Sequence, residues 1–121
     1  MDDTQTHPLS EQLAEVLRQC LHQRRRLPVS TYRLQLHAGF TFREARAIVP
    51  YLAKLGITDV YCSPYLRARP GSTHGYDICN HNVLNPELGS EPDYQAFVEE
   101  LAAHQLGQVL DFVPNHMAVD P

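Results

Sequence analysis

The chain has 121 residues, of which 43% are hydrophobic and 20% are charged, and its formal net charge is -4. These values are typical of a soluble globular domain and exclude a disordered chain. The negative balance and the single lysine, Lys54, argue against a nucleic-acid partner, because phosphate binding needs clustered Lys and Arg. We interpret the one basic run, Arg24 to Arg26, as a solvated helix end.

The cysteines and the N-terminus indicate the compartment. Cys20, Cys62 and Cys79 are far apart and odd in number, which predicts neither a disulfide framework nor a zinc cluster. The chain starts with the acidic pair Asp2 and Asp3 rather than with the basic and apolar start of a signal peptide. No stretch approaches the roughly 20 apolar residues of a membrane span. We therefore expect a protein of the reducing cytoplasm with no membrane partner.

The first expected element is an amphipathic helix from Leu9 to Leu21, in which apolar residues recur at helical spacing until Pro28 ends the pattern. We expect this helix to pack on the outside of its own domain, with a partner-binding or membrane-surface role as the alternative. It defines an N-terminal helical extension, residues 1–29, ahead of a second region, residues 30–121.

The second region alternates between strand and helix patterns. Strands are expected over 31–37, 57–63 and 109–113, and helices over 42–55 and 90–106. Gly56 is suited to end the first of these helices and Ser90 to cap the second, while Pro50 is expected to kink the first or shift its boundary. The order strand, helix, strand, helix, strand predicts an α/β fold with right-handed crossovers and a parallel sheet.

A connection of about 26 residues, 64–89, leaves the carboxyl end of the second strand, and structureless loops of this length are uncommon unless functional or disordered. Within it, residues 72–82 concentrate two histidines, a tyrosine, an aspartate and amides. A tyrosine face suits stacking on a sugar ring, and Asp, Asn and His side chains can bind hydroxyls. On composition alone, a solvated polar loop remains the alternative.

Three polar residues follow the third strand: Asp111, Asn115 and His116. The carboxyl ends of parallel strands are where α/β folds build active sites, so these side chains are candidates for the same site as the loop. A purely structural histidine and simple turn chemistry remain the alternatives. Possible metal ligands are His74, His81, Asn115 and His116, but no spacing among them specifies a metal site.

Four segments resemble the beginning of the maltooligosyltrehalose synthases, a branch of the α-amylase superfamily. They are STYRLQLHAGFTF, YLAKLGITDVYCSPYLRARPGSTHGYD, NVLNPELG and LDFVPNHMAVDP, and they occur in order from about residue 30 to residue 121. The segment DFVPNH by itself indicates only the superfamily. SPYLRARPGSTHGYD together with LNPELG points to this branch.

The resemblance implies a (β/α)8 TIM barrel of which this chain holds the first three βα units. A complete barrel takes roughly 250 residues, so the barrel is expected to be incomplete here. It implies conversion of the reducing-end α-1,4 linkage of a maltooligosaccharide into the α,α-1,1 linkage of trehalose, by chemistry similar to that of retaining glycosidases and with water kept out. No cofactor is implied. The nucleophile and the acid/base are expected downstream, so the isolated chain is expected to be inactive and, with an open sheet edge, poorly soluble.

The resemblance also assigns roles to residues of the loop and strand end. Tyr76 matches the residue that stacks on the sugar at the cleavage subsite, and Asp77 matches the acid that organises charged groups around it. His74 is expected to line or position the pocket, and His116 matches the histidine that binds the hydroxymethyl group of that sugar.

Three further positions are expected to support the site. Asp111 and Asn115 match residues that hold it together, and the asparagine position ligates calcium in many amylases but not generally in this branch, so no metal is expected. Asn80 stands where the branch usually has an acid, which leaves any charge pair of that acid in doubt.

Two other functions remain open. The chain could belong to another α-amylase-type hydrolase or glucanotransferase acting on α-glucans. It could also be a non-catalytic α/β module that binds sugar through Tyr76, Asp77 and His116. For a maltooligosyltrehalose synthase or another α-amylase-type enzyme, the expected partners are an α-glucan substrate and the remainder of the chain's own barrel.

Overall fold

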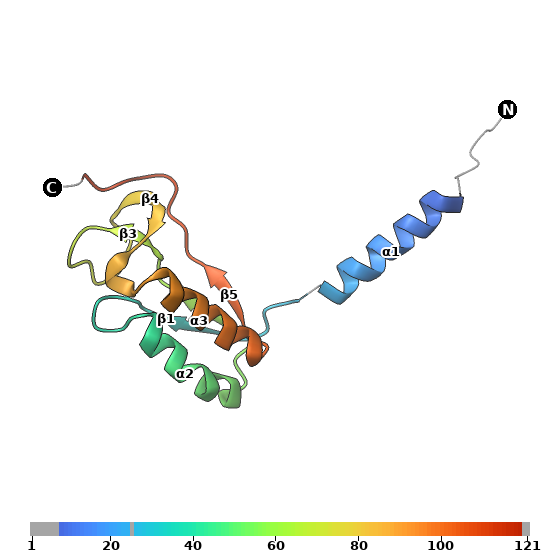
Figure 1. Ribbon diagram of the computed structural model, residues 1–121, viewed down its shortest axis with the longest axis horizontal. Helices are drawn as coiled ribbons and strands as arrows, with labels where there is room; N and C mark the ends of the chain where they lie inside the picture. Colours follow the sequence, from blue (N-terminus) through green and yellow to red (C-terminus); the bar gives the residue numbers. More distant parts are fainter. Residues whose placement is uncertain (1–7, 25, 120–121) are drawn as a thin grey trace.

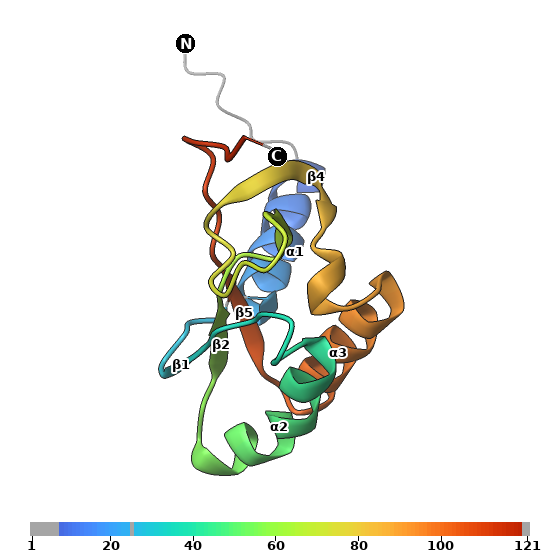
Figure 2. The same cartoon turned by 90° about the vertical axis from the view of Figure 1, so that its left-hand side faces the viewer.

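The computed structural model describes residues 8–24 and 26–119. They form a three-stranded parallel sheet, two helices on one of its faces, an antiparallel strand pair beyond its carboxyl edge, and a helix that stands away from the rest (Figure 1, Figure 2). The elements in chain order are α1 (Pro8–Arg24), β1 (Thr31–Leu34), α2 (Phe42–Leu55), β2 (Asp59–Cys62), β3 (Leu66–Ala68), β4 (Ile78–Leu84), the 3-10 helix η1 (Pro86–Leu88), α3 (Glu91–Ala103) and β5 (Gly107–Leu110). No helix within the described residues is long and apolar enough to cross a membrane.

The sheet confirms the predicted parallel arrangement. Its strand order is β1-β2-β5, and both neighbouring pairs are parallel. The connections through α2 and α3 step across the sheet in the same direction, and both helices lie on one face and contact each other (Figure 2). This singly wound arrangement is the one found in (β/α)8 barrels, whereas doubly wound sheets carry helices on both faces.

The two sheet-covering helices begin and end at clear signals. α2 starts with a capping box between Thr41 and Glu44, and it ends at Gly56, which adopts a φ of 87°. Ser90 caps α3, as expected, although the helix ends at Ala103 rather than at residue 106. Pro50 does not shift the boundary of α2, which has the expected range and continues to Leu55 with its inner face buried.

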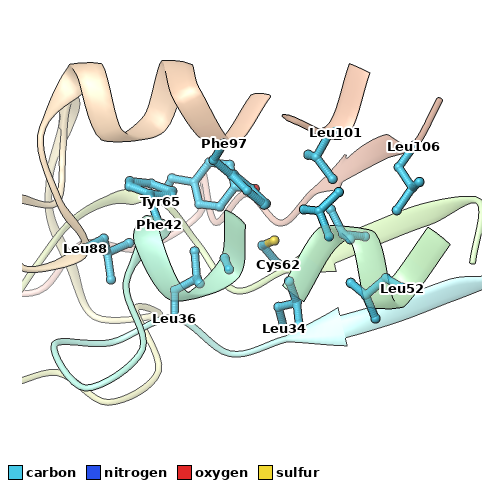
Figure 3. Close-up of a cluster of buried hydrophobic side chains, with 13 residues drawn as sticks. Leu34, Leu36, Phe42, Leu52, Cys62, Tyr65, Leu88, Phe97, Leu101 and Leu106 are labelled. Atoms are coloured by element: carbon cyan, nitrogen blue, oxygen red, sulfur yellow. The ribbon is translucent and has the colours of Figure 1, made fainter. Parts of the chain in front are cut away.

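The core lies between the sheet and the two helices (Figure 3). Phe42 is at its centre, with ring centroids 5.3 Å from Tyr65, 5.3 Å from Tyr94 and 6.1 Å from Phe97. Cys62 of β2 is also buried there, and burial raises the pKa of its thiol to about 11. This cysteine is therefore a packing residue rather than a reactive thiol.

The sequence suggested a loop over residues 64–89, but this connection has secondary structure of its own. It contains the antiparallel pair of β3 and β4 followed by η1. The pairing shifts register on both sides of Arg67, so the segment lacks the regular alternation by which a strand is identified from sequence. The strands of the parallel sheet are likewise shorter than expected, and β5 lies at 107–110 rather than at 109–113.

The N-terminal helix is confirmed, but its expected packing is wrong. α1 does not lie on the sheet or on the other helices (Figure 1), and its apolar side chains are exposed. These exposed side chains are Leu9, Leu13, Val16, Leu17 and Leu21. Helical periodicity identifies the apolar face of a helix, but it does not say what covers that face.

The basic run 24–26 lies at the end of α1, as expected, but Arg26 is more than a solvated side chain. Arg25 lies outside the described residues, whereas the Arg26 guanidinium bonds to the buried carboxylate of Asp59 and to the carbonyl oxygens of Thr58 and Gln105. These groups lie at the amino ends of β2 and β5. Arg26 therefore ties the segment after α1 to the bottom of the sheet.

Candidate functional site

The side chains at the upper part of the sheet alternate between its two faces. Val60 and Cys62 pack toward the helices, so Tyr61 points to the opposite face. The register places Arg33 beside Tyr61 and Tyr61 beside Val109, and Asp111 follows two residues beyond Val109 on the same face. The helix-free face of the sheet thus carries an arginine, a tyrosine and an aspartate from three adjacent strands or strand ends.

Asp111 is the centre of a hydrogen-bonded cluster. Its Oδ2 accepts from the hydroxyl of Tyr61 at 2.9 Å and from the hydroxyl of Tyr76 at 2.5 Å, and it lies 3.5 Å from Nη1 of Arg33. Burial acts to raise the pKa of Asp111, but the hydrogen bonds from Tyr76, Tyr61 and Arg33 outweigh it and lower the pKa. The carboxylate is therefore held ionised, as an acceptor.

The hydroxyl group of Tyr76 is held by two hydrogen bonds. The hydroxyl accepts from Nη2 of Arg33 at 2.8 Å while it donates to Asp111, so its single proton is used inside the protein. The ring of His74 stacks on the ring of Tyr76 with centroids 5.9 Å apart and planes inclined by 22°. What this tyrosine can offer a ligand is consequently its ring surface, which suits a sugar ring.

The turn before Tyr76 is fixed by its own hydrogen bonds. The hydroxyl of Ser72 donates to Oδ1 of Asp77 at 2.5 Å and accepts from the Gly75 amide at 3.0 Å. Gly75 has a φ of 79°, and a Cβ atom there would be 2.9 Å from the carbonyl oxygen of Pro64. The turn therefore requires glycine at this position.

The two histidines nearest Tyr76 are oriented by its backbone. Nδ1 of His74 accepts from the Tyr76 amide at 3.0 Å, so this nitrogen carries no proton and its 3.9 Å approach to Asp77 is not a hydrogen-bonded ion pair. Nε2 of His116 lies 3.1 Å from the Tyr76 carbonyl oxygen, which can only accept. Nε2 is therefore the protonated nitrogen of His116, and Nδ1 faces no described partner.

The segment that carries His116 is held along β4. The Ala118 amide donates to the carbonyl oxygen of Ile78 at 2.8 Å, and Nε2 of His81 lies 3.0 Å from the carbonyl oxygen of Val113. His81, a possible metal ligand from sequence, thus serves to bind the backbone. Among the described residues, no group of three or more His, Cys, Asp or Glu side chains is arranged to hold a metal ion.

Not all of the expected site residues come together. Tyr76, Asp77, His74, His116 and Asp111 form one connected group. Asn115 is exposed at a bend and makes no side-chain hydrogen bond to a described residue, and Asn80 uses its Oδ1 to accept from the Asn82 amide at 2.9 Å. Neither asparagine forms a described hydrogen bond or ion pair with the cluster.

Three members of the cluster were not expected from sequence: Arg33, Tyr61 and Ser72. Arg33 and Tyr61 belong to strands whose residues had been read for periodicity alone. An arginine inside a segment rich in strand-forming residues was the available signal, but only the strand register shows that it faces Tyr61 and Asp111.

The comparison with known proteins defines the class first. The family model "Alpha amylase, catalytic domain" matches residues 47–120, more than half of the chain. The chain therefore belongs to the α-amylase family, whose members include the (β/α)8 barrels expected from its motifs. The match begins inside α2 and spans β2, β3, β4, α3 and β5, so it holds the whole of the described site except Arg33 of β1.

Within that family the chain is similar to trehalose-forming synthases. It is 38% identical over 96 residues, 75% of the chain, to a protein of Mycobacterium tuberculosis named "Putative maltooligosyl trehalose synthase". It is 49% identical to the solved DSM5389 glycosyltrehalose synthase, with a TM-score of 0.73 over 75% of the chain. It is 41% identical to the solved maltooligosyltrehalose synthase of Arthrobacter ramosus, with a TM-score of 0.72 over 74% of the chain. The chain spans only 12% to 13% of the length of these relatives.

Proposed function

We propose that this chain forms the first three strands of a (β/α)8 barrel, with the helices that follow the first two, in an enzyme that makes maltooligosyltrehalose. The enzyme would convert the α-1,4 linkage at the reducing end of a maltooligosaccharide into the α,α-1,1 linkage of trehalose. The observation that carries the proposal is the ring of Tyr76, which is held through its hydroxyl group at the carboxyl edge of the sheet. The chain that forms this site is 41% to 49% identical to solved trehalose-forming synthases.

The cluster supports a binding role for this part of the barrel. The ring of Tyr76 would stack on the sugar at the cleaved bond, and His116 would bind a hydroxyl through its Nδ1. Asp77, oriented by Ser72, would organise polar groups beside that sugar. The rest of the barrel would close over the site and exclude water, so that the released glucose reattacks instead of a water molecule.

The catalytic carboxylates would come from other parts of the barrel. A retaining glycosidase needs one carboxylate as nucleophile and a second carboxyl group that alternates as acid and base. Asp111 is unsuited to either role, because its Oδ2 already faces three donors and its pKa is lowered. Its chemistry fits a residue that holds other side chains in place.

A reducing-end assay on the product of the complete gene distinguishes the candidate functions. With maltopentaose as substrate, a trehalose-forming enzyme removes reducing ends without changing the number of sugar molecules. A hydrolase increases the number of reducing ends, and a glucanotransferase leaves it constant while the chain lengths spread. A loss of reducing ends at constant mass is the result we expect. An increase, or no change together with maltopentaose binding, would contradict the proposal.

A further inference from the structure

The guanidinium of Arg33 joins three parts of the site. Its Nη2 donates to the Tyr76 hydroxyl at 2.8 Å, its Nη1 lies 3.5 Å from Oδ2 of Asp111, and its central carbon lies 4.8 Å from the ring centroid of Tyr61. These partners come from the loop before β4, the end of β5 and the middle of β2. Arg33 itself is on β1, so a single side chain links all three strands of the sheet at the site.

The Tyr76 hydroxyl depends on this arginine for its second hydrogen bond. The phenol has one proton, which it gives to Asp111, and its oxygen accepts from Arg33. Two bonds in different directions fix both the position of the oxygen and the plane of the ring, whereas one bond would allow the ring to turn. A ring that turns presents a less defined stacking surface to a sugar.

The charge of Arg33 is also matched to its surroundings. Burial acts to lower the pKa of this guanidinium, but the hydrogen bond to Tyr76 and the charges nearby outweigh it, and the pKa is raised. The positive charge of Arg33 and the negative charge of Asp111 offset each other in this ion pair. Because 36% of the Arg33 side chain is exposed, it lies at the rim of the site rather than in the core.

Two arginines of α2 form ordinary surface ion pairs. Arg43 pairs with Asp93 at 3.0 Å and Arg46 pairs with Glu100 at 3.8 Å, and both pairs connect α2 to α3 on the outside of the molecule. Neither arginine contacts a residue of the site. Arg33 differs because it bonds the tyrosine on which a sugar would stack and the carboxylate that holds the same tyrosine.

We propose that Arg33 is a positioning residue of the sugar site, which fixes the ring of Tyr76 through its hydroxyl group. The proposal rests on the proposed function for the identity of the ligand. Arg33 acts through Tyr76 and Asp111 and does not touch the reacting atoms. Tyr76 would recognise sugar by its ring alone, because Arg33 and Asp111 together occupy its hydroxyl.

A double-mutant cycle in the complete gene product tests this. Arg33→Met removes the donor, and Tyr76→Phe removes the hydroxyl while keeping the ring. If Arg33 acts through that hydroxyl, each single change lowers kcat/KM for maltopentaose consumption by about tenfold, and the double variant falls only about twofold to threefold below the worse single variant. If the two fold-changes multiply, Arg33 acts independently of Tyr76 and the proposal is overturned.

Three controls separate positioning from general stability. Arg46→Met removes an arginine from a surface ion pair and should leave kcat/KM unchanged. Arg33→Lys keeps the charge with a single donor group and should recover part of the loss. A crystal structure of the Arg33→Met protein should show the Tyr76 ring displaced, and a ring in its original place with full activity would contradict the proposal.

The mutant cycle still tests the role of Arg33 if the proposed function is wrong. Product identity decides between trehalose formation and hydrolysis, whereas the cycle uses only the consumption of maltopentaose. If maltopentaose is bound but not consumed, the proposed function fails and the same cycle is read from dissociation constants. A complete gene product that neither consumes nor binds maltopentaose would overturn both proposals.

Discussion

At the scale of single residues, the binding properties of the site depend on which donors and acceptors are already bonded within the protein. The Tyr76 hydroxyl is used twice, Nδ1 of His74 is taken by a backbone amide, and Nε2 of His116 faces a carbonyl oxygen. The groups of these three side chains without a described hydrogen-bond partner are the Tyr76 ring surface, Nε2 of His74 and Nδ1 of His116. This pattern favours a neutral ligand rich in hydroxyls, because it offers stacking and single hydrogen bonds.

Gly75 and Gly71 form a matched pair for testing the turn that positions Tyr76. Both have positive φ, 79° and 77°, so alanine at either position costs about 1 to 2 kcal/mol. Only at Gly75 would the new Cβ atom also collide with the carbonyl oxygen of Pro64. We expect Gly75→Ala to lower both the free energy of unfolding and kcat/KM for maltopentaose more than Gly71→Ala does. Equal effects in denaturant titrations and kinetics would contradict this role.

The site was partly predictable at this scale. Tyr76, Asp77 and His74 could be selected because their motif resembles that of the α-amylase superfamily, and the structure brings them together. Arg33 and Tyr61 could not be selected, because their role comes from strand register and not from local sequence. Asn115 shows the opposite case, in which a residue of the motif makes no described contact with the cluster.

At the scale of elements, the two helices that cover the sheet are specified by their ends. α2 and α3 both start with a capping box, and the second of these uses Asp93 to bind the Ser90 amide at 2.9 Å. Capping residues, glycine stops and apolar periodicity are local signals, so both helices were predictable. The β3–β4 pair was not, because its irregular register hides the alternation typical of strands.

The cap of α3 should make stability depend on pH. Hydrogen bonds from the Ser90 backbone and hydroxyl, and then from Arg43, lower the pKa of Asp93 from 3.8 to about 2. Its stabilising effect is therefore present above about pH 4 and is lost as the pH falls through about 2. We expect Asp93→Asn to lower the free energy of unfolding at pH 7 and to have little effect near pH 2. Glu99→Gln, on the exposed face of α3, is the control, and a pH-independent Asp93→Asn effect in urea titrations would contradict the assignment.

Arg26 should stabilise the bottom of the sheet. Only 2% of Asp59 is exposed, so Arg26→Met would leave a buried carboxylate whose remaining side-chain donor is the Thr58 hydroxyl. The expected loss in the free energy of unfolding is about 2 kcal/mol. Arg18→Met removes an arginine from an exposed pair on α1 and should cost less than about 0.5 kcal/mol. Equal losses in the two variants would show that Arg26 is not a structural tie.

At the scale of the whole molecule, large apolar areas are left uncovered. Leu110 and Phe112 are exposed beyond the core, β5 has no described partner on its outer edge, and the apolar side of α1 faces solvent. Exposed patches and sheet edges of this kind promote association. In a complete barrel, further strands and helices would cover the sheet edge, which agrees with the small share of its relatives that this chain spans.

The chain by itself should therefore associate as its concentration rises. Light scattering on the 121-residue protein should show a growing mean mass, and replacing Leu13 and Leu17 of α1 by Gln should reduce that growth, because both side chains are exposed. A protein that stays monomeric at all concentrations would contradict the expectation that these surfaces need a covering partner.

The central claim is that Tyr76 belongs to a site that forms trehalose linkages, and proton NMR of maltopentaose tests it most directly. With the complete gene product, the reducing-end anomeric signals should disappear as the α,α-1,1 signal grows. Tyr76→Ala should slow this conversion by at least about tenfold, whereas Tyr51→Ala, on the exposed face of α2, should not. An unchanged rate in Tyr76→Ala, or a product without the α,α-1,1 signal, would contradict the account.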